Sequence, residues 1–211
     1  MNNKKNLSQW RDQFYNNGIL EILDLLNSQF QDYLYCSSKL LVNKLDLEEN
    51  HDGFVVKNIN NNSTPKFQYG SHLSESFLQF LTPFYSEISQ KNLIPTYSYF
   101  RHYNKGSVLT PHVDRPSCQY SATIQVNASE NKVWPIHFFT KNKEVAGSTG
   151  GLFSIIFYKG EDILHWREPL EYDYSSHLFL HWVDRDDPKY KPYHFDGRKG
   201  LFSPSKFGSP K

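Results

Sequence analysis

Two side chains that commonly bind metals are separated by one residue, in His112-Val113-Asp114. In an extended strand, residues i and i+2 point to the same face, so this imidazole and this carboxylate lie side by side. Two histidines and one carboxylate on one face of a divalent ion leave its remaining positions open for small molecules. A lone His-x-Asp also arises by chance, as a surface histidine near a turn. The pair therefore predicts a metal site only if a third ligand converges on it.

We expect the third ligand on a later strand that returns to the same end of a barrel. An apolar run from Leu152 to Phe157 is followed by a turn at Lys159-Gly160 and then by His165. The stretch between His112 and His165 leaves room for about three strands. His181 is an alternative third ligand, and Lys191 would then follow it by ten residues. Pro188 and Pro192 argue against a core strand that reaches Lys191.

Short aromatic and β-branched runs alternate with Gly, Pro and Asn breaks from Pro95 onward. This pattern predicts strands near residues 97–103, 108–112, 119–127, 133–139, 152–158 and 176–183. Many short strands separated by turns indicate a sandwich or a barrel.

The N-terminal part has a different periodicity. Residues 8–34 carry apolar side chains at helical spacing. Gly18 interrupts this pattern, which predicts either two helices or a turn followed by a helix. Residues 74–90 predict another amphipathic helix, interrupted or bent near Pro83. Residues 42–56 suggest a hairpin with a turn at Asp52-Gly53. We expect one domain, mainly β with N-terminal helices (α+β): a helical support region with a possible β-hairpin over residues 1–94, a catalytic core over 95–187 and a C-terminal tail over 188–211.

Composition excludes several classes of protein. The 211 residues carry a formal net charge of +1, so we expect no binding to nucleic acid or to an anionic membrane. No apolar run approaches the roughly 18–20 residues that a membrane span needs. The two cysteines, Cys36 and Cys118, fit a reducing compartment, and no signal peptide is visible. We therefore expect a soluble cytoplasmic protein in which Cys118 is a small buried residue.

Together these features resemble the iron(II)/2-oxoglutarate-dependent dioxygenase superfamily, nearest its prolyl-hydroxylase-like branch. The matching elements lie within roughly residues 97–183 and are Tyr103, Gly106, His112-x-Asp114, Gly151 before an apolar strand, and His165. The resemblance implies a double-stranded β-helix core (jelly-roll, cupin-like) in which His112, Asp114 and His165 bind iron(II) as the catalytic site. It also implies 2-oxoglutarate and O₂ as cosubstrates, ascorbate as an optional reductant, and succinate and CO₂ as coproducts.

One position departs from this family. Its members usually carry Arg or Lys about ten residues after the distal histidine, where this chain has only Asp-Tyr-Ser-Ser-His at residues 173–177. We favour Arg167 as the cation for the far carboxylate of 2-oxoglutarate, because it shares a face with His165 and its fork binds carboxylates. Tyr103 would hydrogen-bond the same carboxylate. The alternatives are His177 (protonated, or through a neutral hydrogen bond), Lys159 and Arg101.

Three functions are open at this point. The first is hydroxylation of an unactivated carbon in a peptide or protein side chain or in a small amino-acid-like metabolite, with Arg115 contacting an anionic part of the substrate. A surface arginine or a salt bridge at a turn explains Arg115 equally well. The second is a non-catalytic β-barrel module with a vestigial or zinc-loaded triad, favoured by the missing late cation. The third, a metal-dependent isomerase or dioxygenase of another barrel class, usually needs more histidine ligands. The substrate and the oligomeric state are not encoded in any recognisable pattern.

Overall fold

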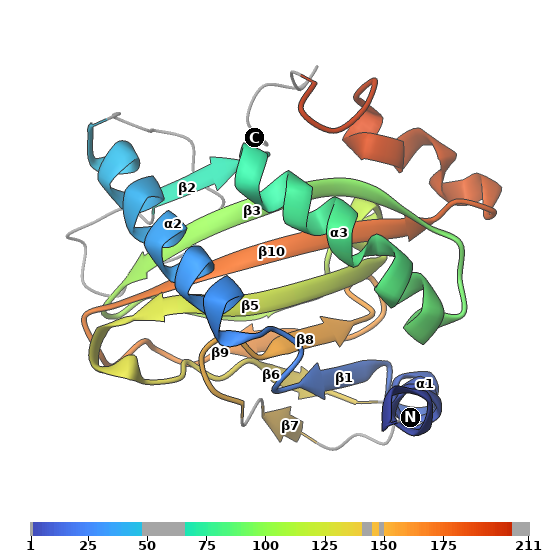
Figure 1. The fold of residues 1–211 in the computed structure, drawn as a ribbon, viewed down its shortest axis with the longest axis horizontal. Coiled ribbons are helices and arrows are strands. Elements are labelled where there is room, and N and C mark those ends of the chain that lie inside the picture. Colours follow the sequence, from blue (N-terminus) through green and yellow to red (C-terminus); the bar gives the residue numbers. More distant parts are fainter. Residues whose placement is uncertain (1, 48–65, 141–144, 148–149, 204–211) are drawn as a thin grey trace.

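Two antiparallel sheets form the core of the computed structural model, which describes residues 2–47, 66–140, 145–147 and 150–203. The larger sheet contains, in spatial order, β1 (Ile19–Ile22), β8 (Ile155–Tyr158), β5 (Tyr120–Ala128), β10 (Tyr174–Asp184), β3 (Leu93–Asn104) and β2 (Lys66–Tyr69). The smaller sheet contains β4 (Leu109–His112), β9 (His165–Arg167), β6 (His137–Phe139) and β7 (Val145–Gly147). This arrangement confirms the predicted jelly-roll core (Figure 1).

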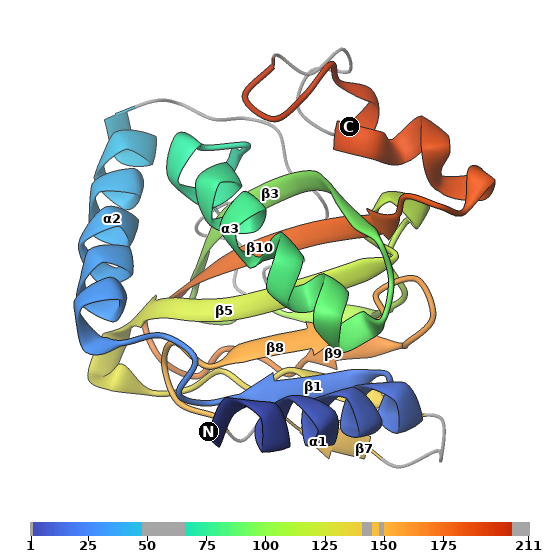
Figure 2. The ribbon, with the colours of Figure 1, turned by 45° about the vertical axis from the view of Figure 1, so that its right-hand side comes forward.

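Three helices support the larger sheet. In both views α2 (Ser28–Leu47) and α3 (His72–Ser89) lie across one of its faces, while α1 (Asn2–Asn17) runs beside β1 (Figures 1 and 2). The helix α3 begins after Ser71, whose side chain caps the backbone N–H of Ser74 at 3.1 Å. It buries Phe77, Leu78, Leu81, Tyr85 and Ile88, the helical spacing that turns one apolar face to the sheet.

Side chains along the three central strands β3, β5 and β10 alternate between two kinds, one on each face of the sheet. On the helix-facing side they bury apolar residues in the main core, among them Phe100, Ala122, Ile124, Leu178 and Leu180. The intervening residues face the interior between the two sheets and are polar or aromatic. Successive side chains of a strand point to opposite faces, so one set builds the core and the other lines a cavity.

The predicted interruption of the helix at Gly18 is confirmed, but the helix expected directly after Gly18 is wrong. Helix α1 ends at Asn17 and Gly18 adopts φ +72°, with its N–H bonded to the carbonyl of Phe14 at 2.7 Å. Gly18 therefore ends the helix in the left-handed conformation that glycine favours there. The four residues that follow form β1, which pairs with β8. A segment of four residues, here Ile-Leu-Glu-Ile, is too short for its periodicity to distinguish a strand from a helix.

Other boundaries also differ from the sequence-based expectation. Residues 42–47 belong to α2 and not to a strand, and the rest of the predicted hairpin lies outside the described residues. The helix α3 continues through Pro83, and β6 starts only at His137. Strands were correctly predicted at β3, β4, β5, β8 and β10, whereas β2, β7 and β9 were not predicted.

The residues after β10 fold back over the molecule. A series of 3-10 turns, η3 (Pro188–Gly197), buries Tyr190 against Ile94 and Val183 at the end of the larger sheet. Among the described helices, none has both the length and the apolar character needed to cross a bilayer.

Candidate metal centre

The fold brings the three predicted metal ligands together. His112 ends β4 and His165 begins β9, and the antiparallel pairing of these strands sets the two residues opposite each other. Asp114 follows β4, where its backbone N–H donates to the carbonyl of Gly160 at 2.8 Å. Ligand atoms of His112, Asp114 and His165 lie within 4.8 Å of one another. Residues far apart in sequence therefore converge at one point between the sheets.

Both imidazoles present the same nitrogen to the centre of this group. The Nδ1 of His112 lies 2.8 Å from the carbonyl oxygen of Thr110, and the Nδ1 of His165 lies 2.8 Å from that of Ile163. A carbonyl only accepts hydrogen bonds, so Nδ1 carries the proton and Nε2 offers its lone pair. Each Nε2 is 3.6 Å from the Oδ1 of Asp114. A backbone carbonyl that fixes the tautomer in this way is the usual support for a metal-binding histidine.

The carboxylate of Asp114 is held in its charged form. Burial alone would raise the pKa of Asp114. Without an ion, imidazoles of His112 and His165 that are also protonated at Nε2 outweigh burial and hold that pKa well below its usual range. The same contact with Asp114 raises the pKa of His112. The second oxygen, Oδ2, accepts a hydrogen bond from the Ser121 hydroxyl at 3.2 Å. The ionised carboxylate of Asp114 therefore faces the two imidazoles before any ion binds.

A glycine makes room for this carboxylate. A Cβ at position 160 would lie 2.4 Å from the Oδ2 of Asp114 and 2.4 Å from the carbonyl oxygen of Cys118. Any larger side chain would displace Asp114 or the backbone. The sequence predicted a turn at Lys159-Gly160 but gave no sign that Gly160 touches a candidate ligand.

The three candidate ligands line a cavity of about 540 Å³ between the two sheets. Tyr97, Tyr99, Arg101 and Tyr103 of β3 form one wall of it. The guanidinium of Arg101 lies over the rings of Tyr99 and Tyr103, with centroids at 5.9 and 5.2 Å. The remaining lining residues are Leu109, Thr110, Val113, Arg115, Cys118, Ile136, Tyr158, Phe179 and His181. This volume is in the range of small-molecule sites.

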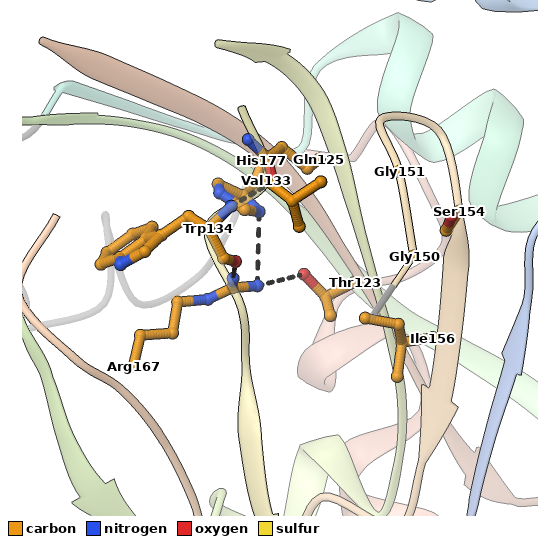
Figure 3. Close-up of a pocket in the computed structure, with 10 residues that line it drawn as sticks. All are labelled: Thr123, Gln125, Val133, Trp134, Gly150, Gly151, Ser154, Ile156, Arg167 and His177. Carbon is orange, nitrogen blue, oxygen red and sulfur yellow. Dashed lines mark hydrogen bonds between the residues drawn. The ribbon is translucent and has the colours of Figure 1, made fainter. Parts of the chain in front are cut away.

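Arg167 and His177 line a separate cavity of about 10 Å³, which is shown in Figure 3. The Arg167 guanidinium contacts the carbonyl of Trp134, and its Nη2 lies 3.4 Å from both the Thr123 hydroxyl and the His177 Nδ1. Its Nε has no hydrogen-bond partner, and no carboxylate of the described residues forms an ion pair with it. Burial lowers the pKa of Arg167 to about 10. Arg167 is therefore a buried cation with unused hydrogen-bonding capacity.

The other residues considered for the cosubstrate are placed differently. Tyr103 lies in the wall of the large cavity, and its ring contacts the rings of Trp134 and His177 at 4.9 and 5.7 Å. Burial, then the charge of Arg167, holds the pKa of His177 well below its ordinary value. His177 is thus neutral, and only a neutral hydrogen bond remains for it. Lys159 is absent from the lining of both cavities.

Arg115 lines the large cavity but is already paired. Its two terminal nitrogens each lie 3.1 Å from an oxygen of Asp196, and its guanidinium lies over the ring of Tyr97 at 4.5 Å. Tyr69 donates a further hydrogen bond to Asp196 at 2.7 Å. The C-terminal segment thus reaches the residue next to Asp114. The sequence gave no signal for Asp196, because only the folded tail brings it there.

No protein-family model matches the sequence, and no curated protein matches it. Solved structures do match in shape. A prolyl hydroxylase from Trichoplax adhaerens, in complex with a hypoxia-inducible-factor peptide fragment, superposes with a TM-score of 0.67 at 14% identity, over 90% of this chain and 94% of that one. A Pseudomonas putida prolyl-4-hydroxylase gives 0.62 at 12%, over 84% and 99%. SnoK, a non-haem α-ketoglutarate-dependent carbocyclase from nogalamycin biosynthesis, gives 0.67 at 8%, over 93% and 92%.

The chain has the fold of the iron(II)/2-oxoglutarate oxygenases. At these sequence identities, the likeness shows the fold alone. The three structures also differ in chemistry, since their names describe two hydroxylases and a carbocyclase.

Proposed function

We propose that this protein is an iron(II)- and 2-oxoglutarate-dependent oxygenase that hydroxylates an unactivated C–H bond. The observation that carries the proposal is the geometry of His112, Asp114 and His165. Two imidazole Nε2 atoms and one carboxylate oxygen converge on one point at the wall of a cavity of about 540 Å³. A facial set of two histidines and one carboxylate suits iron(II) that keeps open positions for small molecules.

The chain's own residues fit this ion in three respects. Carbonyls of Thr110 and Ile163 hold both histidines in the tautomer that binds a metal. The carboxylate of Asp114 stays charged and supplies the negative charge that a dication needs. Gly160 leaves space for that carboxylate. When bound, iron and 2-oxoglutarate supply the oxidising step with O₂, and the protein supplies position and electrostatics.

For the far carboxylate of 2-oxoglutarate we propose Arg167, assisted by Tyr103. Arg167 is 2% exposed and has no carboxylate partner among the described residues, so an incoming carboxylate would neutralise a charge that is costly to bury alone. Its contact with His177 brings the guanidinium to β10, the strand on which members of the superfamily usually carry their cation. Arg101 is the competing candidate, because it lines the cavity that contains the triad.

The substrate would enter the same cavity against the aromatic wall of β3. Tyr97 stacks on Tyr69 and Tyr99 on Phe67, with ring centroids 5.2 and 5.4 Å apart, so side chains of β2 support this wall. We propose a peptide or protein side chain, or a small amino-acid-like metabolite, as the substrate. The peptide complex of the Trichoplax adhaerens enzyme supports the first of these.

Anaerobic titration with iron(II) and 2-oxoglutarate tests the proposal. A weak visible charge-transfer band is expected when both are bound, and succinate should form once O₂ is admitted. His112→Ala and Asp114→Ala should each lose the band and the succinate. A protein that binds the metal but never gives the band would instead be the non-catalytic binding module.

A further inference from the structure

A second group of metal-binding side chains lies beside the first. Cys118, at the end of the 3-10 turn η1 (Pro116–Cys118), and His181, in β10, both line the large cavity. Together with Asp114, their ligand atoms lie within 4.8 Å of one another. Cys118 is 2% exposed and His181 is 5% exposed. The function proposed above uses neither of these two residues.

Asp114 faces the two groups with different oxygens. Its Oδ1 lies 3.6 Å from the Nε2 of both His112 and His165. Its Oδ2 instead accepts from the hydroxyl of Ser121, and that hydroxyl also lies 2.9 Å from the Nδ1 of His181. The second oxygen therefore points to the side of the carboxylate on which His181 lies. A cation on that side would meet an oxygen that the histidine pair does not use.

The donor atoms of the second group favour a softer ion than those of the first. A thiolate, an imidazole and a carboxylate are the three ligand types that Zn²⁺ takes in proteins. The first group contains no sulfur and suits iron(II). Burial raises the pKa of the Cys118 thiol, which in the free protein has the Tyr97 hydroxyl as its partner at 3.1 Å. A bound dication displaces such a proton, because a coordinating thiol is deprotonated outright.

We infer that Asp114, Cys118 and His181 form a second binding position for a thiophilic divalent ion such as Zn²⁺, next to the His112–Asp114–His165 group. The position opens onto the large cavity, so water completes its coordination. The assignment rests on these three side chains and not on the proposed oxygenase activity. It holds or fails separately from that activity.

Cobalt(II), a visible substitute for zinc, provides the test. The chain has two cysteines, and Cys36 is exposed on α2, so in Cys36→Ser protein Cys118 is the only thiol. Titrating this variant with Co²⁺ in a non-thiol reductant should produce a thiolate-to-cobalt charge-transfer band in the near ultraviolet. Adding His112→Ala should leave the band, because the first group alone is disrupted. Adding His181→Ala or Cys118→Ser should abolish it.

Two results would overturn the inference. One is Cys36→Ser protein that binds Co²⁺ without any thiolate band. The other is a band that disappears with His112→Ala but persists with His181→Ala. If the His181→Ala protein does not fold, as judged by circular dichroism, X-ray absorption of the Cys36→Ser, His112→Ala protein decides. One sulfur in the first coordination shell of cobalt supports the site, and none refutes it.

Discussion

The two faces of β3, β5 and β10 are buried almost equally but consist of different side chains. On the helix-facing side, Ala122, Ile124, Leu178 and Leu180 are at most 1% exposed and contact only a core. On the interior side, Thr123, His177 and His181 are at most 5% exposed and line the two cavities. The exposed fraction of a side chain therefore does not distinguish core residues from cavity-lining residues on these strands. The position of a residue in the alternation along each strand does distinguish them, because adjacent side chains point to opposite faces of the sheet.

The largest expected effect is on the interior side. His165→Ala should reduce succinate formation to background, because one of three metal ligands is lost. Its loss of unfolding free energy should be smaller than that caused by truncating a core residue such as Leu180. Coupled assays and urea unfolding measure the two quantities. His137→Ala is the matched control, since His137 stacks on Trp166 in the same small sheet but lines neither cavity. If His137→Ala lost activity as completely, the assignment of the activity to side chains that line the cavity would fail.

The opposite pattern is expected on the helix-facing side. Leu180→Ala should cost about 2–5 kcal/mol of unfolding free energy, because it leaves a cavity under the helices. Metal bound per folded molecule should stay unchanged. Leu40→Ala, at a position 69% exposed on α2, should change stability by no more than about 0.5 kcal/mol. A Leu180→Ala protein with normal stability but no metal binding would contradict this assignment of the faces.

Arg167→Gln should weaken 2-oxoglutarate binding by about 30-fold or more. Leaving one partner of a buried charged pair alone costs about 2–5 kcal/mol, and each 1.4 kcal/mol is a factor of about ten. Anaerobic titration of the visible band measures the dissociation constant. Arg101→Gln serves as the comparison and should have the smaller effect. If Arg101→Gln weakened binding more than Arg167→Gln, the far carboxylate of 2-oxoglutarate would be bound by Arg101 in the wall of the large cavity.

The smallest expected effect is a loss of stability in acid. Burial, then the charge of Lys66, lowers the pKa of His102 to about 4. The unfolded chain, with a histidine pKa near 6.5, therefore binds more protons between these values. Stability is complete above about pH 6.5 and falls as the pH drops toward 4.

We expect His102 to contribute about 1–3 kcal/mol to the loss of unfolding free energy between pH 7.5 and pH 5, as measured by urea unfolding. His102→Asn should show a smaller difference, since Asn does not titrate and retains a group for the Ser176 hydroxyl, which lies 2.8 Å from His102. If His102→Asn lost as much unfolding free energy at pH 5 as the unmodified protein, titratable groups other than His102 would be the cause.

The sequence predicted the grouping of His112, Asp114 and His165 and the class of the fold, but not the bounds of several elements around that group. The side-by-side placement of His112 and Asp114 follows from a local rule about extended backbone, and His165 follows from the order of strand and turn. The strand β1 was misassigned, because its pairing with β8 is a tertiary contact that outweighs a four-residue pattern.

Contacts made by distant parts of the chain had no signal in the sequence. The Asp196–Arg115 pair joins residues that only the folded tail brings together. Cys118 becomes a neighbour of Asp114 only because η1 and β10 meet at the cavity. His181, which the sequence offered as an alternative third ligand, lies beside Asp114 with Cys118 and not in the group of His112 and His165. Arg167 was correctly placed on the face of His165, but local alternation did not show that the two would line different cavities.

An anaerobic crystal structure with Mn²⁺, as an inert substitute for iron(II), and 2-oxoglutarate would decide whether His112, Asp114 and His165 bind one ion together. We expect one ion bound directly by the Nε2 of His112, the Nε2 of His165 and the Oδ1 of Asp114. We also expect 2-oxoglutarate to occupy two of the remaining positions. An ion bound without His165, or a cavity that takes up neither ion nor 2-oxoglutarate, would contradict this expectation.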